Sequence, residues 1–205
     1  MPELPEVEVS RQGIEPGLVG QTISDIVVRT AKLRWTVPEA IHQTHGHIIR
    51  SVTRRAKYLF INTDAGSVIL HLGMTGFLRV FAQSTALKKH DHLDINLSNG
   101  QCLRFNDARK FGACLWQGID DEPHVLLSAL GPEPLTDDFT QDHLHTRAKG
   151  RTCTVKQFVM DNKNVVGVGN IYANEGLFLA KIAPKRAAGK ISAQRYRVLT
   201  GYIKE

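Results

Sequence analysis

The chain has 205 residues, 42% of them hydrophobic, so it can bury the core of one large domain or of two small ones. Lysine and arginine total 26 against 20 acidic residues, and the formal net charge of +6 favours a polyanionic partner such as nucleic acid. Three widely spaced cysteines exclude a disulfide framework and a CxxC zinc site, and they fit a reducing compartment. Because the sequence shows neither a signal peptide nor a membrane-spanning stretch, we expect a soluble cytosolic protein.

The first part of the chain predicts one helix followed by short strands. Residues 5–18 form an amphipathic pattern with a proline in the first turn, an apolar stripe of Val7, Ile14 and Leu18, and Gly20 as a stop. Short β-like runs follow at residues 22–30, 47–53, 57–62, 67–72, 77–81, 92–97, 101–105 and 112–117. Eight short strands separated by turn signals indicate a β-sandwich.

The second part predicts helices. Two prolines and a glycine in the Gly131-Pro132-Glu133-Pro134 stretch resist both helix and sheet, so we predict a boundary between domains 1–131 and 132–205. Helical patterns cover residues 137–149, 154–161, 170–182 and 192–205. The last one is still running at Glu205, so we expect a chain cut from a longer protein. The predicted fold class is α+β, with a leading helix, a β-sandwich and then a helical domain.

The first residues offer an unusual nucleophile. If Met1 is removed, Pro2 presents a secondary amine that can attack a carbonyl-like carbon and form an iminium, or Schiff base, intermediate. Glu3 would lie one peptide away, where its carboxyl group can pass protons. The structural alternative is that Pro2 only permits removal of methionine, while Glu3 and Glu6 are acids favourably placed at a helix N-terminus. These residues alone favour that alternative.

Two cations have both a structural and a functional interpretation. Lys57 begins an apolar strand, so it is either a strand-edge lysine that prevents wrong pairing or a cation near Pro2 that holds a phosphate or moves a proton. His90 lies in a charged hairpin tip and could donate to a phosphate oxygen, whereas His92 alternates into the following strand as a structural residue. Neither histidine has the partners of a metal site.

Two loops carry candidate wedge residues. Met74 lies between two glycines in one predicted loop, where an apolar side chain is either part of a core or a wedge between bases. Arg109 and Phe111 add a cation and an aromatic ring to a second loop.

The helical part contains a polar corner. Asn170 follows a glycine turn as a predicted N-cap, and the free amides of the first helical turn can bind phosphate. The polar residues 161–164 precede this turn, giving a helix, two turns and a helix of the kind that docks on nucleic-acid backbones. Arg151 belongs to a basic stretch that is either a contact surface or a solvated face.

These motifs follow one another in an order that resembles the formamidopyrimidine-DNA glycosylases, the bifunctional base-excision repair enzymes of bacteria. The similar stretches are MPELPEVE, RRAKYL, HLGMTG, KHDH, RFNDARKFG, LGPEPL and MDNKNVVGVGNIYANE. They span essentially the whole chain, and their order makes the resemblance specific although each alone is a weak signal.

The resemblance implies the chemistry of the amino terminus. Pro2 attacks C1′ of the damaged nucleotide, displaces the base and forms a Schiff base with the opened sugar. Glu3 is implied as the proton donor at the sugar oxygen, and Lys57 as the group that aids β-elimination. The implied function is removal of oxidised purines, typically 8-oxoguanine or formamidopyrimidines, followed by β/δ-elimination of the abasic strand.

The resemblance also implies how damaged double-stranded DNA is held. We expect a monomer in the bacterial cytoplasm, associated with the nucleoid. The lesion is flipped out of the duplex because its atoms cannot be reached inside the stack. The implied DNA contacts are His90, Arg109, Arg151 and Asn170. The residues implied to fill the hole left by the flipped base are Met74, Arg109 and Phe111.

The sequence departs from the family pattern in two ways. Ala108 and Lys110 stand where proline and arginine are expected in many relatives. The family continues into a lesion-capping loop and a four-cysteine zinc finger that this sequence lacks, so we expect no metal or cofactor in this chain and reduced turnover on duplex DNA. Two alternatives remain: a noncatalytic DNA-binding fragment, and a glycosylase for oxidised pyrimidines resembling endonuclease VIII, although the Leu4-Pro5-Glu6-Val7 start favours the purine branch.

Overall fold

The computed structural model describes residues 2–205, so the predicted removal of Met1 lies outside the described residues. The chain divides into two compact units, Met1–His124 and Val125–Glu205, and each has a hydrophobic core of its own.

Helix α1, Leu4–Leu18, opens the first unit and confirms the predicted amphipathic helix, since all three residues of its apolar stripe are buried. A capping box between Glu3 and Glu6 closes the first turn, and the backbone N–H of Glu3 donates to Oε2 of Glu6 at 2.8 Å. The start of the helix therefore fixes the conformation of the residues beside Pro2.

All eight predicted strands are present, although β2 begins later than expected. They are β1 (Ile23–Val28), β2 (Ser51–Arg55), β3 (Tyr58–Thr63), β4 (Gly66–His71), β5 (Phe77–Ala82), β6 (Asp91–Leu97), β7 (Gln101–Asn106) and β8 (Ala113–Gly118). They form two antiparallel sheets, with strand orders β1-β6-β7-β5 and β2-β3-β4-β8. The predicted β-sandwich is confirmed.

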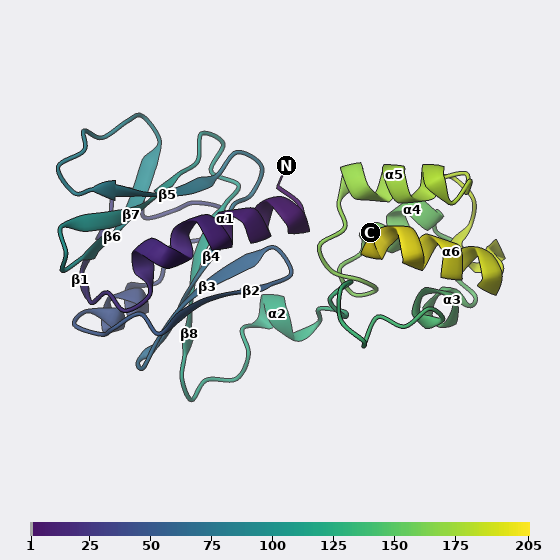
Figure 1. The fold of residues 1–205 in the computed structure, drawn as a ribbon, viewed down its shortest axis with the longest axis horizontal. Coiled ribbons are helices and arrows are strands. Elements are labelled where there is room, and N and C mark those ends of the chain that lie inside the picture. Colours follow the sequence, from purple (N-terminus) through teal and green to yellow (C-terminus); the bar gives the residue numbers. More distant parts are fainter. Residues whose placement is uncertain (1) are drawn as a thin grey trace. The chain divides into compact units, whose positions relative to one another are not determined.

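The core of the first unit draws on both sheets and on α1. Strand β3 alternates, because Leu59 and Ile61 are fully buried while Tyr58, Phe60 and Asn62 are half-buried. Helix α1 packs against β2 and β5, one strand of each sheet (Figure 1). A short 3-10 helix, η1 (Glu39–Thr44), was not predicted, because six residues are too few to show a helical period, yet its Ile41 is fully buried.

The second unit consists of short helices around a separate core. They are α2 (Val125–Ser128), α3 (His143–Ala148), α4 (Val155–Met160), α5 (Asn170–Leu179), the 3-10 helix η2 (Ala188–Lys190) and α6 (Ala193–Lys204). Helices α5 and α6 lie side by side, and the fully buried Tyr196 of α6 belongs to the core (Figure 1).

Two expectations about these helices were wrong. The helix predicted over residues 137–149 is confined to α3, because residues 136–143 form successive turns in which the N–H of Phe139 donates to the carbonyl of Thr136 and the Phe139 ring is buried. Asn170 is the first residue of α5 rather than its N-cap, because the extended backbone of Gly169 provides the capping position.

The three cysteines are free thiols in different environments. Cys102 in β7 and Cys114 in β8 are buried, and burial raises the pKa of the Cys114 thiol to about 12. Cys153, in the second unit, is exposed. Among the described residues, no helix combines the length and the apolar character needed to cross a membrane.

Candidate active site and nucleic-acid interface

The amino-terminal site consists of Pro2, Glu3 and Lys57. Pro2 is half-buried directly before α1, and Glu3 is only 1% exposed. Lys57 is 9% exposed and lies in the two-residue turn that joins β2 to β3, after Ala56, whose positive φ of 52° closes the turn. The expectation that Lys57 begins the strand was therefore wrong, since the strand begins at Tyr58.

The electrostatics of Lys57 place it close to the start of α1. Burial lowers the pKa of the Lys57 amine from its usual 10.5, and the nearby carboxylates of Glu3 and Glu6 act in the opposite direction. A buried amine with a lowered pKa carries a larger neutral fraction than an exposed lysine, and neutral amines accept protons. The site thus combines Pro2, the carboxyl group of Glu3 and a buried amine with a lowered pKa.

A set of ion pairs holds α1 against the β2–β3 turn. Glu8 of α1 accepts from Arg11 at 2.8 Å and from Nε of Arg54 at 3.0 Å. Nη1 of Arg54 donates in turn to the carbonyl oxygen of Ala56 at 2.9 Å, directly before Lys57. Because these groups are partly buried, the contacts fix the turn relative to the helix, and with it Lys57 relative to Glu3.

His71 lies within electrostatic reach of Lys57, and the sequence did not single it out as a candidate site residue. It ends β4 opposite Tyr58, with the two rings 4.9 Å apart, and its Nδ1 accepts from the N–H of Gly73 at 3.0 Å. Burial, together with the positive charges of Arg34 and Lys57, lowers the pKa of His71 from 6.5 to about 4, while the charge of Asp107 acts in the opposite direction. His71 is therefore neutral near pH 7. Its position in the HLGMTG motif was the available signal.

The predicted wedge residues lie on two adjoining loops of the first unit. Met74, on the loop between β4 and β5, is 39% exposed, and Phe111, on the loop between β7 and β8, is 43% exposed. The guanidinium of Arg109 lies 4.6 Å from the centre of the Phe111 ring, as in a cation–π contact. Exposed apolar side chains on loop tips match the predicted wedge better than a core role.

His90 lies in the turn before β6 and has a φ of 75°, a left-handed conformation that is uncommon for a residue other than glycine. The turn is held on both sides, because Asp91 accepts from the N–H of Lys88 at 2.7 Å and Asn106 donates to the carbonyl of Lys89 at 3.0 Å. The surroundings therefore stabilise a strained backbone at His90, which is common at functional positions.

The second unit contains the other predicted contacts. Asn170 is exposed at the start of α5, and Arg151 is exposed before α4. We define the basic corner as Arg147, Arg151 and Lys163, which line a hollow of about 470 Å³ together with Asp161. Hydrogen bonds connect this corner to buried residues. Nε of Arg147 donates to the side-chain oxygen of buried Asn164 at 2.9 Å, and Asn164 donates to the carbonyl of Phe158 at 2.8 Å.

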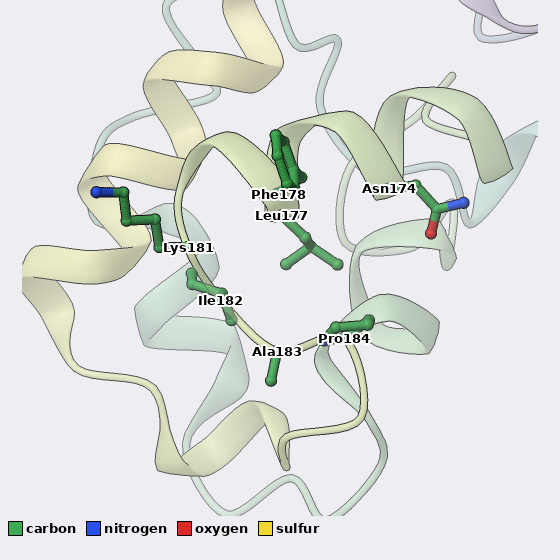
Figure 2. A pocket seen from close by; sticks show the side chains of 7 residues that line it. All are labelled: Asn174, Leu177, Phe178, Lys181, Ile182, Ala183 and Pro184. Atoms are coloured by element: carbon green, nitrogen blue, oxygen red, sulfur yellow. The ribbon is translucent and has the colours of Figure 1, made fainter.

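A second hollow in this unit, of about 530 Å³, is mainly apolar. Figure 2 shows it between α5 and the segment 182–184, with Leu177 pointing into it. It contains none of the predicted site residues. Within residues 2–205, no group of three or more His, Cys, Asp or Glu side chains is placed to hold a metal ion.

The structure thus gathers the predicted residues of the first unit into two groups, the amino-terminal site and the exposed loops that carry His90, Met74, Arg109 and Phe111. It reveals two further residues that sequence reasoning did not select. The carboxylate of Glu6 acts electrostatically on Lys57, and buried Asp107 forms hydrogen bonds with both wedge loops.

Comparison with known proteins gives matches along nearly the whole chain. The family model of the formamidopyrimidine-DNA glycosylase N-terminal domain matches residues 1–114, and that of the formamidopyrimidine-DNA glycosylase H2TH domain matches residues 130–205. The formamidopyrimidine-DNA glycosylases of Photobacterium profundum and Idiomarina loihiensis are 59% identical over 204 residues and 60% identical over 205 residues. Both matches cover 100% of this chain and 76% of the relative.

Solved structures agree. A Lactococcus lactis FPG mutant in complex with Fapy-dG containing DNA has a TM-score of 0.91 at 33% identity, over 99% of this chain and 76% of that chain. MutM in complex with DNA that contains carbocyclic 8-oxo-G has a TM-score of 0.91 at 34% identity, over 99% of this chain and 77% of that chain.

The two matched domains define a class of DNA glycosylases in which a β-sandwich precedes a helix-two-turn-helix domain. The chain belongs to the formamidopyrimidine-DNA glycosylase family, whose members are enzymes of base-excision repair. The resemblance predicted from the motifs is confirmed.

Proposed function

We propose that this chain is a bifunctional DNA glycosylase that removes oxidised purines, such as 8-oxoguanine and formamidopyrimidines, and then cleaves the strand at the abasic site. The observation that carries the proposal is that Glu3, the residue after Pro2, and Lys57 are both buried and lie within electrostatic reach of each other. This arrangement supplies a nucleophile, a proton donor and a proton acceptor in one place.

Pro2 acts first, once Met1 has been removed. Its nitrogen attacks C1′ of the damaged nucleotide, the bond from C1′ to the base breaks, and the base leaves with the bonding electrons and takes up a proton. Glu3 protonates the oxygen of the sugar ring, the bond between this oxygen and C1′ breaks, and a Schiff base between C1′ and Pro2 remains.

Lys57 assists the elimination that follows. Loss of a proton from C2′ breaks the bond between C3′ and its oxygen, and a second elimination breaks the bond between C5′ and its oxygen. The lowered pKa of Lys57 favours this role, because a neutral amine is needed to accept or pass on a proton.

The DNA is held by groups on both units. His90, Arg109 and Arg151 donate to phosphates, and Asn170, at the start of α5, lies where helix N-termini bind anions. Met74, Arg109 and Phe111 enter the stack where the lesion has been flipped out, which offsets part of the unstacking cost.

The remaining parts of the proposal follow from the family. The chemistry uses side chains and the terminal amine, so no metal or cofactor is assigned to this chain, while full-length relatives are expected to carry one structural zinc in a C-terminal finger. The chain acts as a monomer on damaged double-stranded DNA in the bacterial cytoplasm, at the nucleoid. The proposed domains are residues 1–131 and 132–205, so their boundary lies shortly after the point where the two compact units divide, between His124 and Val125.

Borohydride trapping tests the proposal. A chain that has lost Met1 is expected to form a reduced covalent adduct with duplex DNA containing 8-oxoguanine, and peptide mass spectrometry is expected to locate the DNA on the Pro2 nitrogen. The same chain with Met1 retained is expected to form no adduct. An adduct located on a lysine, or no adduct with the processed chain, contradicts the mechanism.

Two competing functions are separated by the same experiment. Salt-dependent binding that ignores the lesion, without any trapping, identifies a noncatalytic DNA-binding protein. The lesion class needs a competition between oxidised purine and oxidised pyrimidine duplexes, since one solved Lactococcus lactis relative is in complex with DNA containing an oxidized pyrimidine. Preferential trapping of the pyrimidine lesion favours the alternative that resembles endonuclease VIII.

A further inference from the structure

Asp107 lies at the centre of the exposed loops of the first unit. It directly follows β7, is 0% exposed, and precedes Arg109 and Phe111 on the same loop. A buried carboxylate is costly unless hydrogen bonds replace the lost water. The hydrogen bonds that Asp107 accepts therefore indicate which parts of the structure its burial stabilises.

The side chain of Asp107 joins the two wedge loops. Its Oδ1 accepts from the hydroxyl of Thr75 at 2.5 Å and from the N–H of Arg109 at 3.2 Å, and its Oδ2 accepts from the N–H of Gly112 at 2.7 Å. Thr75 is the residue after Met74, and its Oγ1 also accepts from the N–H of Arg109 at 3.2 Å. One carboxylate thus connects the loop of Met74 to the loop of Arg109 and Phe111.

The backbone of Asp107 reaches the His90 turn. Its N–H donates to the carbonyl of His90 at 3.1 Å, and its carbonyl accepts from Nε2 of His92 at 2.7 Å. His92 is buried and its Nδ1 lies 2.9 Å from the hydroxyl of Thr30. The structural role predicted for His92 is therefore to hold the backbone of Asp107 against β6.

Close packing reinforces these bonds. A Cβ atom added to Gly73, whose φ is +63°, would lie 2.4 Å from the backbone nitrogen of Gly112. A Cβ atom added to Gly112 would lie 2.6 Å from the ring of Phe105. The two loops are in direct backbone contact, and no side chain fits between them.

We propose that Asp107 is a positioning residue, which acts through Thr75 to hold the Met74 loop, the Arg109–Phe111 loop and the His90 turn as one preorganised surface for entering the DNA stack. The inference rests on the proposed function, because it assigns the rigidity of these loops to the flipping step. A wedge that is already ordered loses less conformational freedom on insertion than a mobile one.

Replacing the Thr75 hydroxyl tests this inference without disturbing a buried position. In the Thr75→Val variant, the single-turnover rate of 8-oxoguanine excision from duplex DNA is expected to fall about 10-fold, because a hydrogen bond to a charged group is lost. Borohydride trapping on a single-stranded abasic oligonucleotide is expected to stay at the wild-type level, since no base has to be extruded there. Thr75→Ser, which keeps the hydroxyl, is expected to restore excision from the duplex.

Two further variants sharpen the test. Asp107→Asn, which turns one acceptor into a donor, is expected to show a larger loss on the duplex with trapping on the single strand retained. Thr53→Val is the matched control, since Thr53 is an exposed threonine of β2 whose hydroxyl accepts from Asn62, and it is expected to excise at the wild-type rate.

The outcomes separate the role of Asp107 from the proposed function. A wild-type rate for Thr75→Val on the duplex overturns the inference, and so does an equal loss on duplex and single strand, which would indicate general damage to the fold. Absence of trapping by the wild-type chain on the single-stranded substrate contradicts the proposed function itself.

Discussion

The amino-terminal site and the basic corner differ in whether their charged side chains are buried or exposed. Glu3 and Lys57 are buried, and Arg54 and Glu8 hold the elements that carry them. In the basic corner, Arg147 and Arg151 are exposed, and the buried amide of Asn164 accepts from Arg147. Burial alters the proton affinity that proton transfer needs, whereas phosphate contacts need only charge and position, so the proposed chemistry falls to buried groups and the proposed phosphate contacts to exposed ones.

The largest effect is expected from Glu3→Gln. Glutamine keeps the volume and an acceptor oxygen for the helix cap, but it cannot donate a carboxyl proton, so base excision is expected to fall about 1000-fold by loss of general acid catalysis. Single-turnover excision and the thermal midpoint are the measurements, and the midpoint is expected to change little.

Glu39→Gln is the matched control for this variant, because the side chain of Glu39 is 99% exposed on η1. It is expected to leave excision unchanged. If Glu3→Gln excised the base at the wild-type rate, the buried carboxyl group of Glu3 would have only a structural role. The amino-terminal site would then not differ from the basic corner in using burial for proton transfer.

A pH dependence of stability is expected from His71, which lies close to the amino-terminal site. Its pKa is about 4 in the folded chain against an ordinary value of 6.5 for an exposed histidine, so between these values the unfolded chain binds more protons. Stability therefore rises with pH across this window and is lost as pH falls, by at most about 3 kcal/mol.

Urea unfolding at several pH values between 4 and 6.5 measures this dependence. His71→Gln is expected to flatten the curve relative to the wild type in that window. An unchanged slope in the variant would show that His71 is accessible to protons in the folded chain.

The smallest effects are expected in the second unit, and they differ in kind. Arg151→Ala is expected to weaken duplex binding about 10-fold and to reduce the dependence of log binding constant on log salt by about 1, because one phosphate contact with a cation is lost. Asn170→Ala is expected to weaken binding without changing the salt slope, because an amide carries no charge.

Fluorescence anisotropy at several salt concentrations distinguishes these variants. If Asn170→Ala lowered the slope as much as Arg151→Ala, Asn170 would not be an uncharged contact that acts through its position alone.

The fold could be predicted from local signals. Short β-like runs separated by turn residues indicated eight strands, and the Asn99-Gly100 pair marked the tight connection between β6 and β7, where Gly100 has a φ of 82°. Such patterns depend only on residues that are neighbours in the sequence, so they can be recognised without a structure. Where residues far apart in the sequence decide the outcome, as for buried Phe139 within the turns before α3, the prediction failed.

The candidate site was predicted in part. The chemical character of Pro2 and Glu3 is visible in the sequence, but the proximity of Lys57 to Glu3 depends on the Arg54–Glu8 pair, whose members come from β2 and α1. Asp107 stood in a recognised motif without an assigned role, because its partners Thr75 and His92 belong to other segments. Tertiary contacts of this kind produce no periodic pattern in the sequence.

The contrast among the thiols has a practical consequence. Cys114 stays protonated at any pH used for labelling and Cys102 is buried, so both react slowly with maleimides, whereas Cys153 is exposed beside Arg151. A dye attached to the unmodified sequence should therefore report from the edge of the basic corner, where the approach of a DNA backbone would change its emission.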